Sequence, residues 1–295
     1  NTYTRVLREA IDPRDGRIHC TFQQTAGVSG RLITTDPDLQ RTPIRTDDGK
    51  RIRAAFVPRA GWEMVSADWS QIELRILAHF SQDPLLLESF RDGVDVHRKT
   101  ASQIYGIAPD EVDATQRNVG KTVNFATIYG QGAVALGQSL GMPRSEAKDL
   151  IDRYFQVYAG VRDWLDETIA EAHQLGYCET VLGRRRLIPE LSSRSPTDIA
   201  YGERIAANTP IQGSAADICK LAMLAIDERI RTEKLRSRML LQIHDELVFE
   251  APPEELDTLV ALVRECMEHP LPDDLALDVP LVVDIGHGAS WSAAH

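Results

Sequence analysis

Two segments that read as buried strands, far apart in the chain, each end in acidic residues. The first runs Ser66-Ala-Asp-Trp-Ser-Gln-Ile-Glu73, and the second runs Leu241-Gln-Ile-His-Asp-Glu-Leu-Val-Phe-Glu250. The apolar residues that lead into the acids predict strands, so a sheet rather than mobile loops would hold Asp68 and Asp245. This requirement for two buried strands constrains the fold more than any other feature of the sequence.

Two carboxylates held in this way can share a pair of divalent metal ions. Metals roughly 3.5–4 Å apart activate the attacking oxygen and neutralise the leaving oxygen of a phosphoryl transfer. We therefore predict that Asp68 and Asp245 bind metal. Taken singly, an acid at the end of a strand is more often only solvated, so the prediction depends on other segments of the chain.

A third segment, between the two acidic ones, combines cations and aromatic rings at helical spacing. Arg117, Lys121, Phe125 and Tyr129 recur every four residues and would form one stripe along a helix. The cations suit a triphosphate, and the rings suit a base or sugar that must be stacked. The alternative is an amphipathic helix that packs its rings in a core.

Together, the three segments resemble the motifs of the DNA polymerase I family, the family A DNA polymerases. Asp68–Arg75 resembles the first palm motif, Arg117–Gly130 the nucleotide-binding fingers helix, and Gln242–Glu246 the second palm motif, in the same order and spacing. Further similar segments cover essentially the whole chain: Thr25–Leu32, Asp36–Gln40, Asp95–His97, Gly183–Arg186, Asn208–Gly213 and Gly286–Trp291.

The resemblance implies an α+β fold, the right-hand polymerase fold, in which an antiparallel-sheet palm carries an inserted helical fingers subdomain. We expect the first part of the palm at residues 1–83, with a residual thumb-connecting segment, the mainly helical fingers at 84–190, and the second part of the palm at 191–295. The chain begins at Asn1 without Met. Most of a thumb and an exonuclease-like domain would precede it.

Local patterns agree with a mixed fold. Residues 1–60 predict irregular or hairpin structure, with turns at Asp15-Gly16, Asp36-Pro37 and Asp48-Gly49. Strands are expected at 63–68 and around 281–285, and hairpins at 177–189 and 238–250. Helices are expected from residue 70, at 198–235 and at 254–269, and also across 84–175 with breaks at Gly106, Pro109, Gly130, 141–143 and Gly160.

The implied activity is template-directed DNA synthesis, in repair or replication. Deoxyribonucleotides would be added to a primer 3′-hydroxyl by two-metal-ion phosphoryl transfer, with release of pyrophosphate. Two Mg²⁺ ions, for which Mn²⁺ can substitute, would be bound by Asp68, Asp245 and the backbone carbonyl of Trp69. The partners would be primer–template DNA and dNTPs.

The chain is expected to be monomeric and cytoplasmic, with no membrane partner. No apolar run approaches the roughly 20 residues of a membrane span, and the N-terminus does not resemble a signal peptide.

The resemblance also assigns roles to single residues around the nucleotide. Arg117, Lys121 and His97 would bind the triphosphate, and Lys121 could protonate the departing pyrophosphate. Phe125 would stack on the incoming nucleotide and Tyr129 would shape the pocket of the nascent base pair. The remaining nucleotide-binding candidates are Gln71 and Glu73.

Two acids carry open alternatives. Glu73 would crowd a ribose 2′-hydroxyl and so select deoxyribonucleotides, and it is also an acid favoured at a helix N-terminus. Glu246, a catalytic candidate beside Asp245, is either an outer-sphere support for the metals or a solvated strand acid.

Six polar residues are candidates for testing base-pair geometry in the minor groove, where every Watson–Crick pair presents acceptors. They are Arg31, Arg204, Asn208, Gln212, Gln242 and His244. The alternative for Arg204, Asn208 and Gln212 is an ordinary solvated helix face, because they too recur every four residues.

The net charge of −11 argues at first against a nucleic-acid partner. Residues 245–295, however, hold 12 acidic residues and one basic residue, Arg264. Residues 1–244 hold the remaining 32 of each sign. The excess of acid is confined to the C-terminal stretch, so basic grooves can exist elsewhere.

Some positions depart from the family pattern. Trp69 stands where Tyr is usual, Asn118 replaces a second Arg, and Ala126 replaces a Gly. Gly120 lies inside the predicted fingers helix, where Gly costs about 1 kcal/mol relative to Ala. Asp38 replaces an Asn that would contact DNA. None of these changes removes a metal ligand, so we expect effects on rate or fidelity.

Three other functions stay open. A metal-dependent nuclease would use paired acids but would not need the stripe from Arg117 to Tyr129. A single-subunit RNA polymerase shares the palm chemistry, and Glu73 argues against it. A chain without a thumb could also bind primed DNA without useful turnover.

Overall fold

The computed structural model describes residue 3, residues 5–43 and residues 46–295. Residues 1, 2, 4, 44 and 45, which belong to the predicted first palm segment, lie outside the described residues. The chain divides into two compact units. Unit 1 comprises residues 1–70, 216–272 and 281–295, and unit 2 comprises residues 71–215 and 273–280. These boundaries differ from those drawn from the sequence, at 83/84 and 190/191, and the names palm and fingers stay a prediction.

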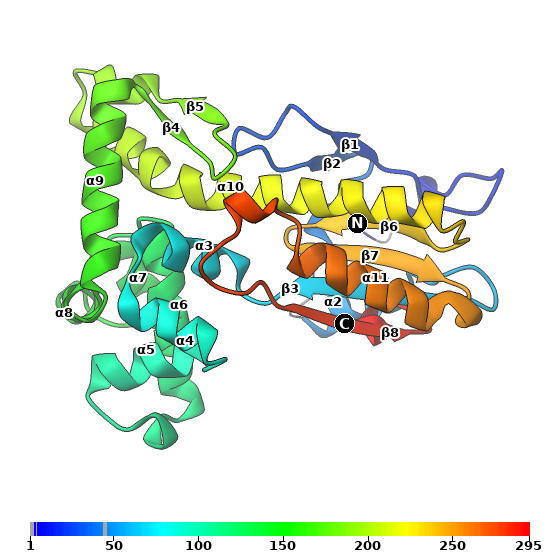
Figure 1. Ribbon diagram of the computed structural model, residues 1–295, viewed down its shortest axis with the longest axis horizontal. Coiled ribbons are helices and arrows are strands. Elements are labelled where there is room, and N and C mark those ends of the chain that lie inside the picture. The colour runs from blue at the N-terminus through cyan, green and yellow to red at the C-terminus, as the bar shows by residue number, and fades with distance from the viewer. Residues whose placement is uncertain (1–2, 4, 44–45) are drawn as a thin grey trace. The chain divides into compact units, whose positions relative to one another are not determined.

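Unit 1 is built on a four-stranded antiparallel sheet in the order β6-β7-β3-β8 (Figure 1). Its strands are β3 (Glu63–Trp69), β6 (Arg238–Ile243), β7 (Glu246–Ala251) and β8 (Val283–Gly288). The register places Asp68 opposite Glu246 of β7 on one side and opposite Asp284 of β8 on the other. The predicted α+β class, with an antiparallel sheet, is confirmed.

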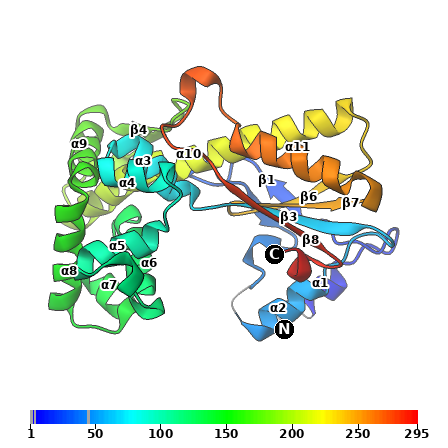
Figure 2. The same ribbon diagram turned by 60° about the horizontal axis from the view of Figure 1, so that its bottom comes forward.

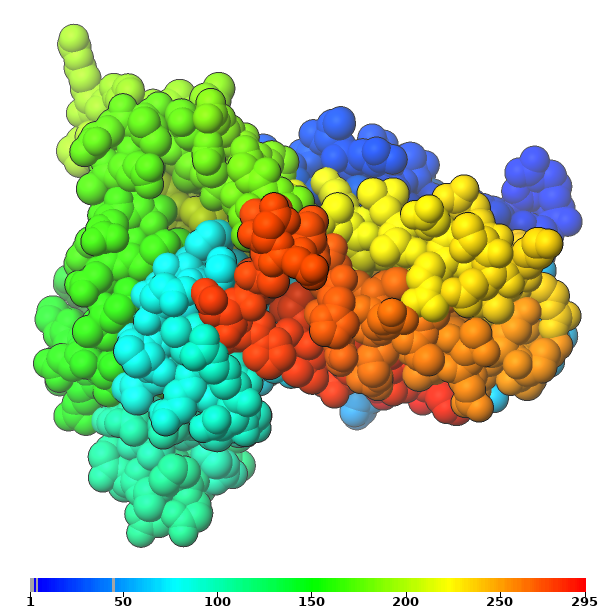
Figure 3. Space-filling view, in the orientation of Figure 1, coloured from blue at the N-terminus to red at the C-terminus, as the bar shows by residue number. Residues whose placement is uncertain are grey.

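Helices cover both faces of this sheet. Helix α11 (Leu256–Glu268) and the C-terminal part of α10 (Pro196–Thr232) lie on one face, and α2 (Asp47–Ala54) and α12 (Trp291–Ala294) lie on the other (Figure 2). In the space-filling view, the yellow and orange surfaces of α10 and α11 lie side by side (Figure 3). Because helices cover both faces, β3 is buried over most of its length.

Helix α2 corrects one prediction from the sequence, because Asp48-Gly49 is not a turn. Thr46 caps the helix with its side chain, which accepts a hydrogen bond from the backbone N–H of Gly49. A Cβ on Gly49 would lie 2.7 Å from the carbonyl oxygen of Pro43. The lack of a side chain at Gly49 therefore allows the backbone of α2 to lie close to that of Pro43.

Unit 2 consists mainly of helices. They are α3 (Ile72–Ser81), α4 (Pro84–Arg91), α5 (Val96–Tyr105), α6 (Ala114–Ile128), α7 (Ala133–Leu140), α8 (Arg144–Val157), α9 (Ala159–Leu175) and the first part of α10. Aspartates cap α4, α5 and α6 at their N-termini, and glycines with positive φ end α5, α7 and α9. A short hairpin, β4 (Tyr177–Glu179) and β5 (Arg185–Leu187), follows α9.

The predicted break at Gly160 is wrong by two residues, because the chain bends at Tyr158, between α8 and α9. Gly160 lies in the first turn of α9 and donates its N–H to the Asp83 carboxylate at 3.1 Å. A Cβ there would lie 3.0 Å from the Cα of Asp83. Like Gly49, this glycine allows the helix backbone to come close to another part of the backbone, at Asp83.

The remaining elements are short. Unit 1 also contains α1 (Val6–Glu9), the two-stranded sheet of β1 (Thr21–Gln23) and β2 (Ile33–Thr35), and short 3-10 helices at Leu39–Arg41 and Pro253–Glu255; unit 2 has others at Pro109–Glu111, Pro189–Ser192 and Asp273–Leu275. Within the described part of the chain, no helix has the length and apolar character needed to cross a membrane.

Candidate active site

The sheet of unit 1 brings the two predicted metal ligands together. Asp68 lies near the end of β3, and Asp245 lies in the two-residue turn between β6 and β7. The backbone N–H of Trp69 donates to the carbonyl of Asp245 at 3.2 Å. The tight turn needs a residue with positive φ, and His244 takes that conformation with φ of 56°. Strand pairing therefore fixes both aspartates.

The electrostatics of this pair favour a bound cation. Burial, as the largest cause, together with the neighbouring carboxylates of Asp245, Glu246 and Asp284 raises the pKa of Asp68 to about 7. Burial is also the main cause of the raised pKa of Asp245. The Oδ1 atom of Asp68 is buried without a hydrogen-bond partner among the described residues. These residues fit a divalent metal, which would supply the missing partner and offset the repulsion.

Glu246 has a different environment from its neighbour Asp245. It is 4% exposed, so the alternative of a solvated strand acid is wrong. Its Oε1 accepts hydrogen bonds from the Ser66 hydroxyl at 2.6 Å and from the Trp291 indole at 2.7 Å. Its Oε2 lies 3.4 Å from the Arg53 guanidinium. Both carboxylate oxygens of Glu246 therefore already face donors of the protein. Its role as an outer-sphere support for the metals stays a prediction.

Arg53 is a site residue that the sequence reading missed. It lies on α2, is 5% exposed, and has its guanidinium carbon 3.9 Å from the centre of the Trp291 ring. Its charge acts to lower the pKa of Asp68 against the other influences. The Asp48-Gly49 pair predicts a turn where the structure has α2, so the sequence carries no signal that would place Arg53 beside the acids.

Trp69 is held firmly by the fold. The ring is 1% exposed, and its indole N–H donates to the carbonyl of Met267 at 2.7 Å. The tryptophan that replaces a tyrosine is therefore accommodated by a bond to the end of α11. The use of its backbone carbonyl as a metal ligand stays a prediction.

Three of the predicted DNA contacts line one pocket of unit 1. Arg31, Gln242 and His244 surround a cavity of about 360 Å³ together with residues of the 26–33 segment and Gln40. Gln242 is 4% exposed, and its amide accepts from Gln40 and donates to the carbonyl of His244. The structure thus brings these residues together, while their contact with DNA stays a prediction.

In unit 2, the predicted stripe lies on α6. Arg117 pairs with Asp95, with 2.6 Å between Nε and Oδ2, and Lys121 is exposed one turn later. The rings of Phe125 and Tyr129 are stacked at a centroid distance of 6.3 Å. Both rings are only half-buried, so the stripe is not simply the core-facing side of a helix.

Tyr129 connects the end of α6 to two other candidates. Its hydroxyl donates to Oε2 of Glu73 at 2.8 Å, and its carbonyl accepts from the side-chain amide of Asn208 at 3.3 Å. Glu73 lies in the first turn of α3 and is 7% exposed. The structure therefore brings the predicted sugar-selecting acid and the predicted base-pair pocket into direct contact.

The other candidates of unit 2 lie nearby or at helix ends. The side chain of Arg204 packs against Gly130, since a Cβ built there would lie 3.3 Å from its Cγ. Gln212 is half-buried on α10, two turns after Arg204. Gln71 is the N-cap residue of α3, with φ of 59°. The alternative of an exposed, solvated helix face describes Arg204, whereas Asn208 and Gln212 are half-buried.

His97 is more enclosed than a surface phosphate ligand would be. It lies in the first turn of α5, is 3% exposed, and has its ring 5.9 Å from that of Phe125. Burial and the nearby Arg117 lower the pKa of His97 to about 4. Its imidazole is therefore neutral at pH 7.

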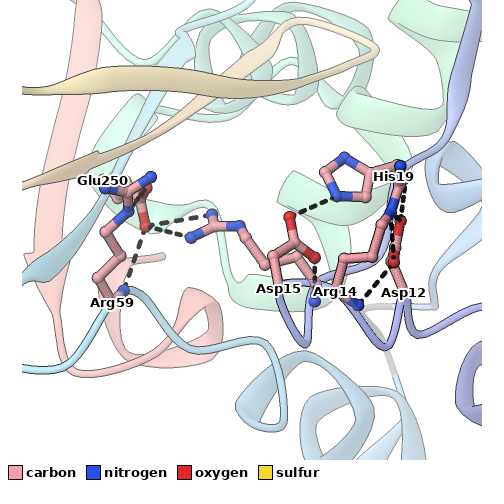
Figure 4. Close-up of polar contacts among 7 residues, drawn as sticks. Asp12, Arg14, Asp15, His19, Arg59 and Glu250 are labelled. Carbon is pink, nitrogen blue, oxygen red and sulfur yellow. Dashed lines mark hydrogen bonds and ion pairs between the residues drawn. The ribbon is translucent and has the colours of Figure 1, made fainter.

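A second group of acids and a histidine lies in the N-terminal segment (Figure 4). Asp12, Asp15 and His19 present ligand atoms within 4.8 Å of one another. Asp12 already accepts hydrogen bonds from Arg14, and Asp15 pairs with His19. This group is therefore a set of ion pairs in which Asp15 and His19 are exposed and Asp12 is half-buried.

Glu250, also shown in Figure 4, joins the N-terminal segment to the sheet. It lies near the end of β7, is fully buried, and pairs with Arg17 at 3.2 Å and with Arg59 at 3.1 Å. Two guanidinium groups thus neutralise one buried carboxylate inside unit 1.

The sequence and the fold match a known family of polymerases. The family model for DNA polymerase family A matches residues 1–293, and this chain belongs to that family. Family A DNA polymerases depend on metal ions.

Particular relatives cover the whole chain. It is 47% identical over 294 residues to the thermostable DNA polymerase I of Thermus thermophilus and 47% identical over 292 residues to DNA polymerase I of Bacillus subtilis. Among solved structures, it is similar to the POL domain of Pol1 from M. smegmatis, which was solved in complex with DNA primer-template and dNTP. That match has a TM-score of 0.93 and 47% identity, and covers 98% of this chain and 50% of the other.

The chain spans about a third of the length of these curated relatives: 34% of the Thermus protein and 33% of the Bacillus protein. The match to the family covers residues 1–293 of this chain. About two thirds of each of these two relatives lies outside the part that matches this chain.

Proposed function

We propose that this chain is the catalytic part of a template-directed DNA polymerase. It adds deoxyribonucleotides to a primer 3′-hydroxyl, releases pyrophosphate, and serves DNA replication or repair in the cytoplasm. The observation that carries the proposal is the pair Asp68 and Asp245, held by strand pairing. Both have raised pKa values, and one buried oxygen of Asp68 has no hydrogen-bond partner within residues 3, 5–43 and 46–295. A nuclease would need this pair but not the nucleotide-binding groups on α6.

In this proposal, Asp68, Asp245 and the Trp69 carbonyl hold two Mg²⁺ ions, which Mn²⁺ can replace. When bound, the metals activate the primer hydroxyl and neutralise charge on the transferring phosphate. Glu246 does not bind metal directly, because Ser66 and Trp291 already donate to it. It instead supports the β7 strand that carries the turn with Asp245.

Unit 2 supplies the nucleotide-binding groups. Arg117 and Lys121 bind the triphosphate, and Lys121, which is exposed, donates a proton to the departing pyrophosphate. Phe125 stacks on the nucleotide. Glu73 excludes a 2′-hydroxyl, and its bond to Tyr129 holds its carboxylate in a fixed position for that purpose.

The proposed partners are primer–template DNA and dNTPs. Arg31, Gln242 and His244 of unit 1, and Arg204, Asn208 and Gln212 of unit 2, would test minor-groove geometry. Gln242 would need to exchange its bond with Gln40 for one with DNA. The monomeric state is part of the same proposal.

The test is single-turnover primer extension with protein in excess over DNA, Mg²⁺, and either dNTPs or rNTPs. We expect templated dNTP addition and a large preference over rNTPs. Asp245→Asn should abolish addition, whereas Asp163→Asn, which removes an exposed carboxylate on α9, should leave the rate unchanged. Glu73→Ala should raise the relative rate of rNTP addition.

Absence of extension by the wild-type chain, at concentrations where it binds the primed DNA, would contradict the proposal for this chain. It would favour a DNA-binding module without turnover. Strand cleavage in place of extension would favour a nuclease.

A further inference from the structure

The packing of α6 on α5 encloses His97 and uses a glycine to do so. A Cβ on Gly120 would lie 2.3 Å from the backbone carbonyl oxygen of His97 and 3.0 Å from the N–H of Ala101. Only glycine permits this approach, because the obstructing atoms belong to backbone. The glycine that looked unfavourable in the sequence therefore brings the next turn of α6, with Asn124, against the imidazole.

Asn124 contacts the ring of His97 directly. It is fully buried, and its side-chain nitrogen lies 3.1 Å from Nδ1 of His97. The same nitrogen is 3.0 Å from the Thr100 hydroxyl, which lies 2.9 Å from the Tyr158 hydroxyl. Since an amide nitrogen only donates, Nδ1 must accept and cannot carry a proton in this arrangement. The proton of a neutral ring is then on Nε2.

The surroundings of His97 agree with a neutral ring. Burial and the positive charges of Arg117 and Lys121 on α6 lower the pKa of His97, and Asp95 at the cap of α5 opposes them. The structure gives Nε2 no hydrogen-bond partner among the described residues. With Nδ1 accepting from Asn124, the ring keeps its Nε2–H for another acceptor, near the two cations Arg117 and Lys121 that suit phosphate.

We propose that Asn124, held by Thr100 and Tyr158, is a positioning residue that keeps His97 in its Nε2–H tautomer. His97 then offers the nucleotide triphosphate a neutral hydrogen-bond donor. The opposite tautomer would present a lone pair at Nε2, which repels a phosphate oxygen. This inference rests on the proposed function, because it takes the triphosphate to be the ligand of His97.

The tautomer can be read without any nucleotide by ¹⁵N NMR of histidine-labelled protein, with the His97 signals assigned by their loss in His97→Gln. In the wild-type protein we expect a proton on Nε2 and none on Nδ1. Asn124→Asp replaces the donor with an acceptor, so Nδ1 should become protonated at about pH 8.5, where a free imidazole is neutral. A wild-type ring protonated on Nδ1 would overturn the proposal.

The consequence for binding is measured by single-turnover extension over a range of dNTP concentrations. Asn124→Asp should weaken apparent dNTP affinity roughly tenfold or more, with a smaller effect on the rate at saturation. Asn118→Asp is the matched control, because it makes the same change at an exposed position of α6. It reports the general effect of a negative charge on that helix and should leave the tautomer unchanged.

Equal losses of dNTP affinity in the two variants would refute the positioning role. If Asn124→Asp does not fold, as judged by circular dichroism, Asn124→Leu removes the donor without adding charge. An unchanged tautomer and unchanged affinity in Asn124→Leu would also refute it. If the proposed function is wrong, the wild-type chain will extend no primer, whereas its NMR spectrum will still give the tautomer of His97.

Discussion

At the scale of single residues, the adjacent acids Asp245 and Glu246 lie in different environments. Asp245 shares a crowded, half-buried site with Asp68, whose Oδ1 has no hydrogen-bond partner in the part of the chain that the structure describes. Glu246 is surrounded by donors. The sequence identified both acids from their motif, but it could not distinguish their environments, because Ser66, Trp291 and Arg53 meet Glu246 only through the sheet register and the packing of α2 and α12.

The raised pKa of Asp68 predicts how the metal-free protein responds to pH. The folded-state pKa is about 7, against a usual value near 4, so between these values the folded protein holds a proton that the unfolded chain releases. The free energy of unfolding should therefore fall as pH rises from about 4 to about 7. Urea unfolding in EDTA at several pH values measures this slope.

Asp68→Asn should flatten that part of the pH profile and make the metal-free protein more stable at pH 8, while abolishing extension. Adding Mg²⁺ at pH 8 should stabilise the wild-type protein and have a much smaller effect on Asp68→Asn. An equally steep decline in both proteins would show that other groups cause the slope.

Glu246→Gln should destabilise the protein, in contrast to Asp245→Asn. The change leaves the Arg53 guanidinium, which is 5% exposed, without its counter-charge. Breaking a buried pair from one side costs about 3–5 kcal/mol. The measurement is the urea midpoint, and the double variant Arg53→Met, Glu246→Gln should recover part of the loss. No recovery in the double variant would point to the bonds from Ser66 and Trp291 instead.

At the scale of elements, the sequence predicted most helices and strands but missed the reasons for particular glycines. Gly106, Gly141 and Gly176 end helices with positive φ, as the turn chemistry indicates. Gly49, Gly120 and Gly160 lie inside helices, where each meets backbone from another part of the chain. Local propensity cannot separate these two uses, because the second depends on tertiary contacts.

Gly120→Ala tests this distinction. Ala is favoured over Gly in a helix by about 1 kcal/mol, yet the variant should lower stability, since its Cβ would overlap the carbonyl of His97. We expect a net loss of about 1–3 kcal/mol in urea unfolding, together with weaker dNTP binding. Gly132→Ala is the control, because nothing lies within 4 Å of a Cβ there. A more stable Gly120→Ala would contradict the close helix contact.

At the scale of the whole molecule, the family resemblance predicted the fold class, and comparison with relatives confirmed the family. The division into units differed, because motif spacing does not show which segments pack together. Residues 273–280, for example, belong to unit 2, where Arg75 donates to the carbonyl of Pro280 at 2.6 Å and His79 pairs with Asp278. The spacing of motifs along the sequence does not predict such contacts.

The charge distribution gives a prediction at the same scale. The net charge of −11 comes from residues 245–295, where Asp257, Asp273 and Asp274 are exposed. Replacing these three by Asn should raise the rate constant for association with primed DNA at low salt by roughly two- to tenfold. Stopped-flow binding at 20 and 500 mM salt tests this. A gain that persists at high salt would show a local contact instead of a long-range field.

The discontinuity of unit 1 has a consequence for synthesis on the ribosome. Strand β3 is translated first, yet both strands that flank it, β7 and β8, come after the whole 71–215 segment. At roughly 5–20 residues per second, about ten to thirty-five seconds separate the emergence of Asp68 from that of Asp245. During that interval β3 lacks both neighbouring strands, so its backbone stays unpaired and open to chaperone binding. The nascent chain can bring Asp68 and Asp245 together only after the whole 71–215 segment has been synthesised.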